Sequence, residues 1–152
     1  MKVAPLSKRQ EPGLNRLLRE YWETRGMRYS AAYTRRYLRE GHRIEILGDR
    51  FFVAVDGQEV IGCASVVFQE PEVAELRDLF VRPAWRNRGV ANQLLLASVA
   101  ACRTRKVRKV FALVFPEVAD LYRAHGFREE GRLRSHFARG EDLLIVARFL
   151  RT

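Results

Sequence analysis

Three arginines precede a glycine and an apolar helical pattern in the segment VRPAWRNRGVANQLL, near the middle of the chain. The backbone N–H groups at a helix start lack intrahelical partners, and the helix dipole adds partial positive charge there. Such a start binds anions. Gly89 allows a phosphate to approach the backbone closely, Ala91 keeps the next approach open, and arginine side chains supply forked donors. The segment therefore predicts a phosphate or pyrophosphate site, which involves Arg82, Arg86 and Arg88.

The glycine pattern limits the kind of phosphate site. The Gly-Lys-Ser/Thr ending of a Walker loop is absent, and a single glycine does not make the dinucleotide pattern G-x-G-x-x-G. Taken alone, R-x-x-G-x-A is a weak signal, because one glycine near a helix start usually marks only a turn.

The elements around this segment predict an α/β fold. Helical spacing of apolar residues covers 11–25, and a second helical segment follows over 28–41. Asp56-Gly57 separates two β-branched runs, which predicts a hairpin. A strand over 73–81, a helix after Gly89 and a strand over 110–115 predict a right-handed crossover between parallel strands. A short helix over 116–126 and a last strand over 142–150 complete a mixed sheet, with helices on both faces.

Length and charge limit the class of protein. We expect the 152 residues to form one domain. The net charge of +10 attracts anions, but the basic residues are spread along the chain without a run of five or six, which does not favour a nucleic acid partner. Cys63 and Cys102 lie in apolar segments, and no apolar leader or membrane-length run is present. These features predict a cytoplasmic protein, and no Cys/His cluster predicts a metal site.

Two motifs together resemble the GNAT superfamily of N-acetyltransferases. LFVRPAWRNRGVANQLL resembles the family's coenzyme A-binding segment, in which a strand ends in L-x-V-x-P before Q/R-x-x-G-x-G/A opens a helix. Downstream, LYRAHGF resembles the family's L-Y-x-x-x-G-F. The resemblance covers the chain from Phe51 to the C-terminus and implies a GNAT fold with a mostly antiparallel sheet and one parallel pair of strands.

The resemblance also implies how acetyl-coenzyme A binds. The strand that ends at Leu79, Phe80 and Val81 is expected to splay from its parallel neighbour, and the pantetheine arm to lie in the gap. The pyrophosphate is expected on the backbone amides of Asn87, Arg88, Gly89, Val90, Ala91 and Asn92, beside Arg86. Many relatives carry an asparagine just after the second strand, where this chain has Phe115-Pro116. Trp85 is expected to pack beside the phosphate site.

Acetyl transfer needs a neutral amine, a donor to the carbonyl oxygen and a proton for the leaving thiolate. Tyr122 occupies the family's tyrosine position and is our candidate acid, the alternative being a buried packing role. A backbone N–H near Phe80 or Val81, where relatives have a bulge, is the candidate donor. Glu75 and Asp78 are candidate bases, with a slight preference for Glu75. Three residues apart on a strand, they face opposite sides unless a bulge intervenes.

Several alternatives stay open from the sequence. A surface ion pair with Arg77 could explain either acid, and water could replace a dedicated base. Tyr29, Tyr33 and Tyr37 fit core packing of their helix; as a second possibility, Tyr29 or Tyr33, with Arg28, faces the acceptor. The predicted activity is acetyl transfer to a primary amine of a small molecule, an amino acid or a peptide. The alternatives are a non-catalytic coenzyme A sensor and, less favoured, a basic nucleic acid-binding protein. An exposed last strand could pair two chains as a homodimer.

Overall fold

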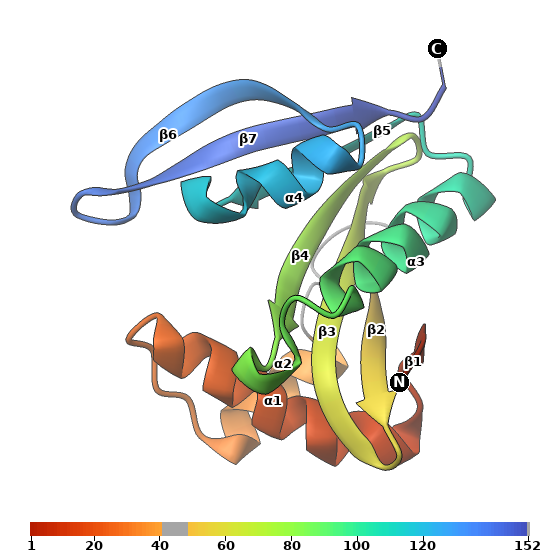
Figure 1. The fold of residues 1–152 in the computed structure, drawn as a ribbon, viewed down its shortest axis with the longest axis vertical. Helices are drawn as coiled ribbons and strands as arrows, with labels where there is room; N and C mark the ends of the chain where they lie inside the picture. Colours follow the sequence, from red (N-terminus) through yellow and green to blue (C-terminus); the bar gives the residue numbers. More distant parts are fainter. Residues whose placement is uncertain (41–48, 152) are drawn as a thin grey trace.

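The computed structural model describes residues 1–40 and 49–151, with seven strands and four helices in this part of the chain (Figure 1). The strands are β1 (Lys2–Pro5), β2 (Asp49–Asp56), β3 (Glu59–Glu70), β4 (Val73–Val81), β5 (Lys109–Val114), β6 (Arg128–Ala138) and β7 (Glu141–Phe149). The helices are α1 (Glu11–Thr24), α2 (Ala31–Glu40), α3 (Val90–Thr104) and α4 (Ala119–Ala124). Short 3₁₀ turns lie at Lys8–Gln10, Pro83–Trp85 and Pro116–Val118.

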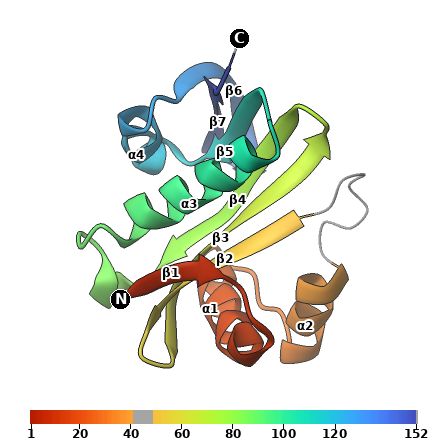
Figure 2. The same ribbon diagram turned by 90° about the vertical axis from the view of Figure 1, so that its right-hand side faces the viewer.

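All seven strands join one sheet in the order β1-β2-β3-β4-β5-β7-β6. The β4–β5 pair is parallel and every other pair is antiparallel. Helix α1 packs on one face of the sheet through a core that includes Leu14, Leu17 and Trp22, and α3 packs on the other face. Figure 2 shows α1 and α2 on one side of the sheet and α3 on the other. The predicted mixed sheet with helices on both faces is confirmed.

The parallel pair separates halfway along its length. β4 and β5 are paired from Val73 opposite Lys109 to Leu76 opposite Ala112, and no pairing follows on this side of β4. β5 continues instead against β7, up to Val114 opposite Leu144. The two strands diverge toward the helical end of the molecule (Figure 1). Among the described residues, β4 is thus not paired with β5 beyond Leu76, and that edge of the strand faces the gap.

The C-terminal strands differ from the expectation. The sequence analysis assigned no separate strand to the charged segment REEGRLRSHFA, which forms β6. β6 forms the edge of the sheet, and β7 lies between β5 and β6. The expectation that the last strand is exposed is therefore wrong. Any pairing of two chains through this end would therefore use β6. Charged side chains suit an edge strand because one of its edges and its outer face meet solvent.

Two smaller expectations are also corrected. β5 is not covered on both faces, since Leu113 is exposed. Tyr29 and Tyr33 are exposed and stack on one another, so the three tyrosines do not form one buried row. Tyr29 and Tyr37 each meet the buried Trp22 edge-on. The expected helix stop at Gly41 lies outside the described residues. Within the described residues, no helix is long and apolar enough to cross a membrane.

Candidate active site

The turn before α3 presents a row of backbone amides. Asn87 and Gly89 adopt left-handed conformations, with φ of 62° and 81°, which turn the chain tightly into the helix. The amide of Gln93 donates to the Gly89 carbonyl at 3.1 Å, where the helix begins. Among the described residues, the amides of 87–92 have no backbone acceptor outside the helix. A Cβ added at Gly89 would meet nothing within 4 Å, so the approach to these amides is open.

Arg86 and Arg88 hold this turn in place. Arg86 Nε donates to the Val81 carbonyl at 3.1 Å, and the Arg88 guanidinium lies 5.0 Å from the Trp85 ring centroid. Trp85 therefore packs beside the amide row. Both arginines are exposed and form no ion pair with a described residue, so their charge remains available beside the amides.

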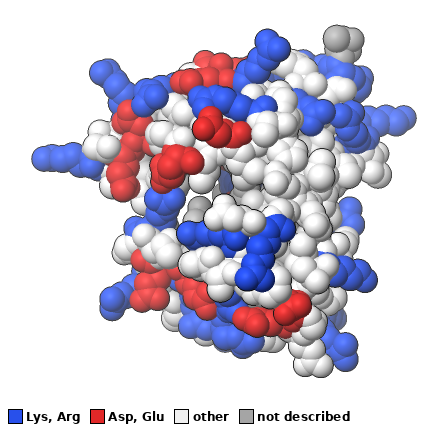
Figure 3. All heavy atoms as spheres, in the orientation of Figure 1, with Lys and Arg blue, Asp and Glu red and all other residues white. Residues whose placement is uncertain are grey.

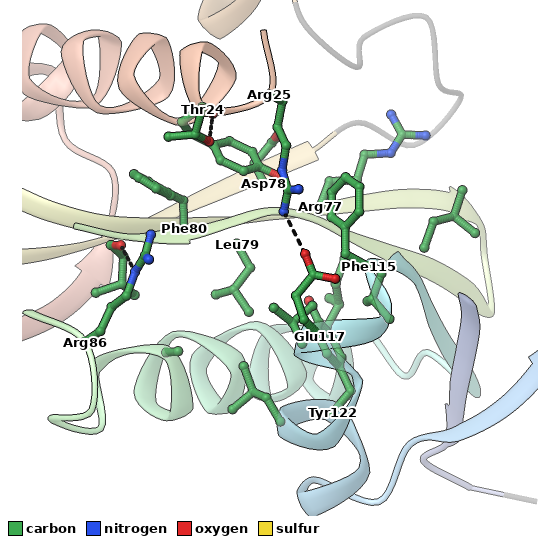
Figure 4. A pocket seen from close by; sticks show the side chains of 18 residues that line it. Thr24, Arg25, Arg77, Asp78, Leu79, Phe80, Arg86, Phe115, Glu117 and Tyr122 are labelled. Carbon is green, nitrogen blue, oxygen red and sulfur yellow. Dashed lines mark hydrogen bonds and ion pairs between the residues drawn. The ribbon is translucent and has the colours of Figure 1, made fainter. Parts of the chain in front are cut away.

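A cavity of about 400 Å³ leads from this turn into the gap between β4 and β5 (Figure 4). Val81, Arg86 and Ala91 line its end near α3. Leucines from β4, β5 and α4 line the middle, namely Leu76, Leu79, Leu113 and Leu121. The far end lies against α1 and the turn after β5. The separation of the parallel strands thus creates an apolar channel between the turn before α3 and a polar chamber.

A β-bulge shapes β4 where it lines the channel. Ser65 of β3 pairs with Arg77 and Cys63 pairs with Phe80, so two residues of β4 lie opposite Ala64. The bulge lies just before Phe80 and Val81, where we expected it. Its first residue, Asp78, has a left-handed φ of 55°, a conformation that aspartate tolerates better than most residues.

The thiol of Cys63 fills the bulge. It donates to the Asp78 carbonyl at 3.2 Å and accepts from the Phe80 amide. Burial is the main reason that the pKa of this thiol lies well above its ordinary value, so it stays protonated as a donor. The Phe80 amide is thereby occupied on the β3 side of the strand. The sequence carried no signal for this role of Cys63 beyond its apolar surroundings.

The occupied amides show which backbone donor faces the gap. The Phe80 amide points toward β3, and the Arg82 amide donates to the Ile61 carbonyl of β3 at 2.9 Å. Successive amides of a strand alternate between its two edges. The Val81 amide, which lies between them, therefore points to the edge that faces β5 and the channel.

The bulge places Asp78 and Glu75 on the same face of the sheet. Asp78 accepts hydrogen bonds at Oδ2 from Tyr37 at 2.8 Å and Ser65 at 2.9 Å, and it lines the cavity. Glu75 is buried and accepts at Oε1 from Gln69 and Arg77, both at 2.7 Å, and it does not line the cavity. The geometry therefore favours Asp78 over Glu75 as the acid that meets a substrate.

Tyr122 faces the channel from α4, on the side opposite Asp78 and α1 (Figure 4). Its ring is buried and meets Phe127 edge-on, with the ring centroids 5.4 Å apart. No described residue forms a hydrogen bond with its hydroxyl. Burial, with a smaller contribution from Tyr21, raises the pKa of Tyr122 above its ordinary value of 10, so the phenol keeps its proton.

Four residues of the chamber were not singled out as site residues by the sequence. Tyr21 and Arg25 come from α1, and Phe115 and Glu117 follow β5. Tyr21 stacks on Phe80 at 5.0 Å, and burial followed by the nearby Asp78 raises the pKa of Tyr21 to about 12. These segments lie 90 residues or so apart in sequence and carry no shared motif, so only the fold brings them together.

Comparison with known proteins identifies the family. Residues 48–129, more than half of the chain, match the model of the acetyltransferase (GNAT) domain. The chain belongs to this family. It is 32% identical over 79 residues to an uncharacterized N-acetyltransferase of Chlorobaculum tepidum; this alignment covers 52% of the chain and half the length of that relative.

Solved structures share the fold along nearly the whole chain. An aminoglycoside 6′-N-acetyltransferase in complex with coenzyme A is 14% identical, with a TM-score of 0.82, and the alignment covers 100% of this chain and 98% of that one. A ribosomal-protein-alanine N-acetyltransferase from Brucella melitensis is 23% identical, with a TM-score of 0.82 and coverage of 99% and 100%. The GNAT fold that the motifs predicted is confirmed.

Proposed function

We propose that this chain transfers an acetyl group from acetyl-coenzyme A to a primary amine, acting as a single domain over residues 1–152. One observation carries the proposal. A continuous cavity joins the amide row before α3 to a chamber that contains Asp78 and is faced by Tyr122. The anion site, the apolar channel and the polar chamber follow one another in the order of a phosphate, a pantetheine arm and a thioester.

The residues of this site fit coenzyme A, which supplies the activated thioester. The open approach at Gly89 and the amides of 87–92 fit a pyrophosphate, with Arg86 and Arg88 adding positive charge. The edge of β4 at Leu79, Phe80 and Val81, where β5 no longer pairs with it, fits an amide-bearing arm that needs backbone partners. Pro116 cannot donate to such an arm, because proline lacks an N–H.

The chamber residues can carry the proton transfers. Asp78 would accept a proton from the ammonium form of the acceptor, directly or through water, since its carboxylate is already oriented by Tyr37 and Ser65. The amine nitrogen then attacks the thioester carbonyl carbon, and the Val81 amide would donate to the carbonyl oxygen as charge develops there. As the carbon–sulfur bond breaks, Tyr122 would donate its proton to the sulfur, and the second proton that the attacking nitrogen loses would return to the Tyr122 oxygen through water. The products are then the amide, coenzyme A and the proton held by Asp78.

The charge of the chamber indicates the kind of acceptor. Arg25 and Arg77 face it together with the carboxylates of Asp78 and Glu117, so the chamber is not strongly negative. With a net charge of +10 on the whole chain, this disfavours polycationic amines such as polyamines. A small monoamine, an amino acid or a peptide amino group fits better. Two free buried cysteines are consistent with a reducing compartment, which supports a cytoplasmic location.

Release of free coenzyme A in the presence of a library of amines tests the proposal. Turnover with at least one amine that falls in Asp78→Asn and Tyr122→Phe, with coenzyme A affinity retained, would support it. Coenzyme A binding without turnover across the library would favour the non-catalytic sensor. Absence of coenzyme A binding by a folded protein would contradict both.

A further inference from the structure

A second cavity, of about 340 Å³, lies between α1 and α2 and is strongly basic. We call it the α1–α2 groove. Its lining includes five cationic side chains and a single carboxylate: Lys8, Arg16, Arg19, Arg35, Arg39 and Glu11. These residues come from two stretches of the sequence, 8–19 and 31–39, in which other residues separate them. The fold gathers them into one place.

The positive charge of the groove has little internal compensation. Among the described residues, Lys8, Arg16, Arg35 and Arg39 form no ion pair, and Arg19 donates to the neutral Asn15 side chain at 3.0 Å. Arginines elsewhere are often neutralised, as where Arg82 meets both Glu20 and Glu59. Figure 3 likewise shows acidic side chains interspersed with basic ones over the face that it draws. Like charges confined to one groove repel, and a bound anion would relieve that repulsion.

The two helices present their cations as facing rows. Arg16 and Arg19 are three residues apart on α1, and Arg35 and Arg39 are four apart on α2, so each pair shares a helix face. Asn15 Nδ2 donates to the Ala31 carbonyl at 3.0 Å and fixes the helices to each other. Arg35 and Arg39 lie about 6 Å apart along the axis of α2, at 1.5 Å per residue. A chain of phosphates matches such rows better than a single anion does.

The remaining lining residues indicate which part of a nucleic acid the groove would recognise. The other lining residues are Pro12, Ala31, Leu38 and Asn15, and no aromatic ring is among them. Stacking platforms for nucleobases use aromatic side chains, so bases would not be recognised here. Guanidinium groups pair with phosphate oxygens through forked hydrogen bonds. This combination fits the sugar–phosphate backbone without regard to base sequence.

We propose that the α1–α2 groove binds the phosphate backbone of a nucleic acid. The spread of charge along the sequence did not favour such a partner, but the clustering in three dimensions does, and the net charge of +10 would speed the encounter. The groove and the acyl-transfer cavity share no lining residue, although both use α1. Nucleic acid can therefore bind while the cavity stays open.

Fluorescence anisotropy with a labelled 12-nucleotide oligouridine tests the proposal, measured from 50 to 200 mM NaCl. The double variant Arg16→Glu/Arg35→Glu should bind at least tenfold more weakly than the wild type at the lowest salt. Its plot of log affinity against log salt should be shallower by about 1.4, because each phosphate contact on a single strand contributes about 0.7. The milder Arg16→Gln/Arg35→Gln variant should show the same trend, and serves if the first variant does not fold.

The matched control is Arg128→Glu/Arg139→Glu, which changes the net charge equally at exposed positions that form no ion pair with a described residue. It should lose less than threefold in affinity and keep the wild-type salt slope. Equal losses in the two variants, or no binding by the wild type, would overturn the groove as the site. If tripolyphosphate binds the groove as tightly as the oligouridine, the ligand is a small polyphosphate and not a nucleic acid. If a polyglutamate peptide does so, the ligand is an acidic protein. Coenzyme A affinity should be unchanged in every variant, which confirms that each is folded.

Discussion

The guanidinium carbon of Arg25 lies 3.5 Å from the centroid of the Phe115 ring. The same group reaches Glu117 Oε1 at 3.6 Å, and the ring of Phe115 in turn meets Phe137 edge-on. Arg25 follows the end of α1, whereas Phe115 and Glu117 follow β5. This contact joins the end of α1 to the turn after β5 across the chamber. The dashed line in Figure 4 marks the ion pair of Arg25 with Glu117.

Removing this contact should widen the chamber. We expect Arg25→Ala to raise kcat/KM for bulky amines relative to small ones, because the side chain no longer crosses the opening. The free energy of unfolding should fall by about 0.5–1 kcal/mol, the usual size of a cation–π contact at an exposed site. Coenzyme A affinity, measured by calorimetry, should stay within twofold. An unchanged preference between bulky and small amines would assign Arg25 to stability alone.

The Tyr122 hydroxyl should act in the chemical step. Tyr122→Phe keeps the ring and its contact with Phe127, so the melting temperature and coenzyme A affinity should change little. The kcat should fall by roughly 10²-fold, the lower range for a positioned acid. Steady-state kinetics with a confirmed acceptor measures this. Full activity in the variant would leave Tyr122 as a packing residue.

A matched pair of amide variants should distinguish the roles of Asp78 and Glu75. Asp78→Asn should lower kcat by about 10²-fold or more near neutral pH, because the chamber loses its candidate base. Glu75→Gln should retain activity within a few fold but lose about 1–3 kcal/mol of stability, since a buried charged hydrogen bond to Arg77 is weakened. Kinetics and chemical denaturation report the two effects. The opposite pattern would return the base role to Glu75.

Gly89→Glu should weaken acetyl-coenzyme A binding at least tenfold, about 1.4 kcal/mol. A side chain at a φ of 81° is strained, it obstructs the amide row, and glutamate adds negative charge beside the phosphates. The turn lies at the surface, so circular dichroism should show an intact fold. Unchanged affinity in calorimetry would place the phosphate site elsewhere.

Tyr21 should make stability depend on pH in the alkaline range. Its pKa is raised from 10 to about 12 mainly by burial, so the folded state retains a proton that the unfolded chain releases. The contribution of Tyr21 to the free energy of unfolding is therefore complete below pH 10 and declines as the pH rises toward 12. Denaturation curves of the wild type and Tyr21→Phe should converge or cross over this window, with the wild type losing more. Parallel pH dependence of the two proteins would contradict the raised pKa.

Local sequence determined the parts of the protein that depend on neighbouring residues. Asp56-Gly57 predicted the β2–β3 hairpin because that dipeptide suits a tight turn, and Pro83 predicted the end of β4 because proline cannot extend a strand ladder. The pattern around Gly89 predicted a turn and a helix start there, and Gly89 adopts the left-handed conformation that glycine allows. The sequence did not predict β6, because a charged edge strand lacks a clear alternation of apolar and polar residues.

Only the tertiary structure decided which distant groups meet. The Cys63 thiol of β3 donates to the carbonyl of Asp78 in the bulge, and the bulge turns Asp78 to the same face as Glu75, against the alternation of a regular strand. Arg25 reaches Phe115 only because α1 packs beside the opening between β4 and β5. The α1–α2 groove arises in the same way, since two packed helices bring together cations that the sequence keeps apart. Such contacts depend on packing between segments, for which a single sequence carries no local signal.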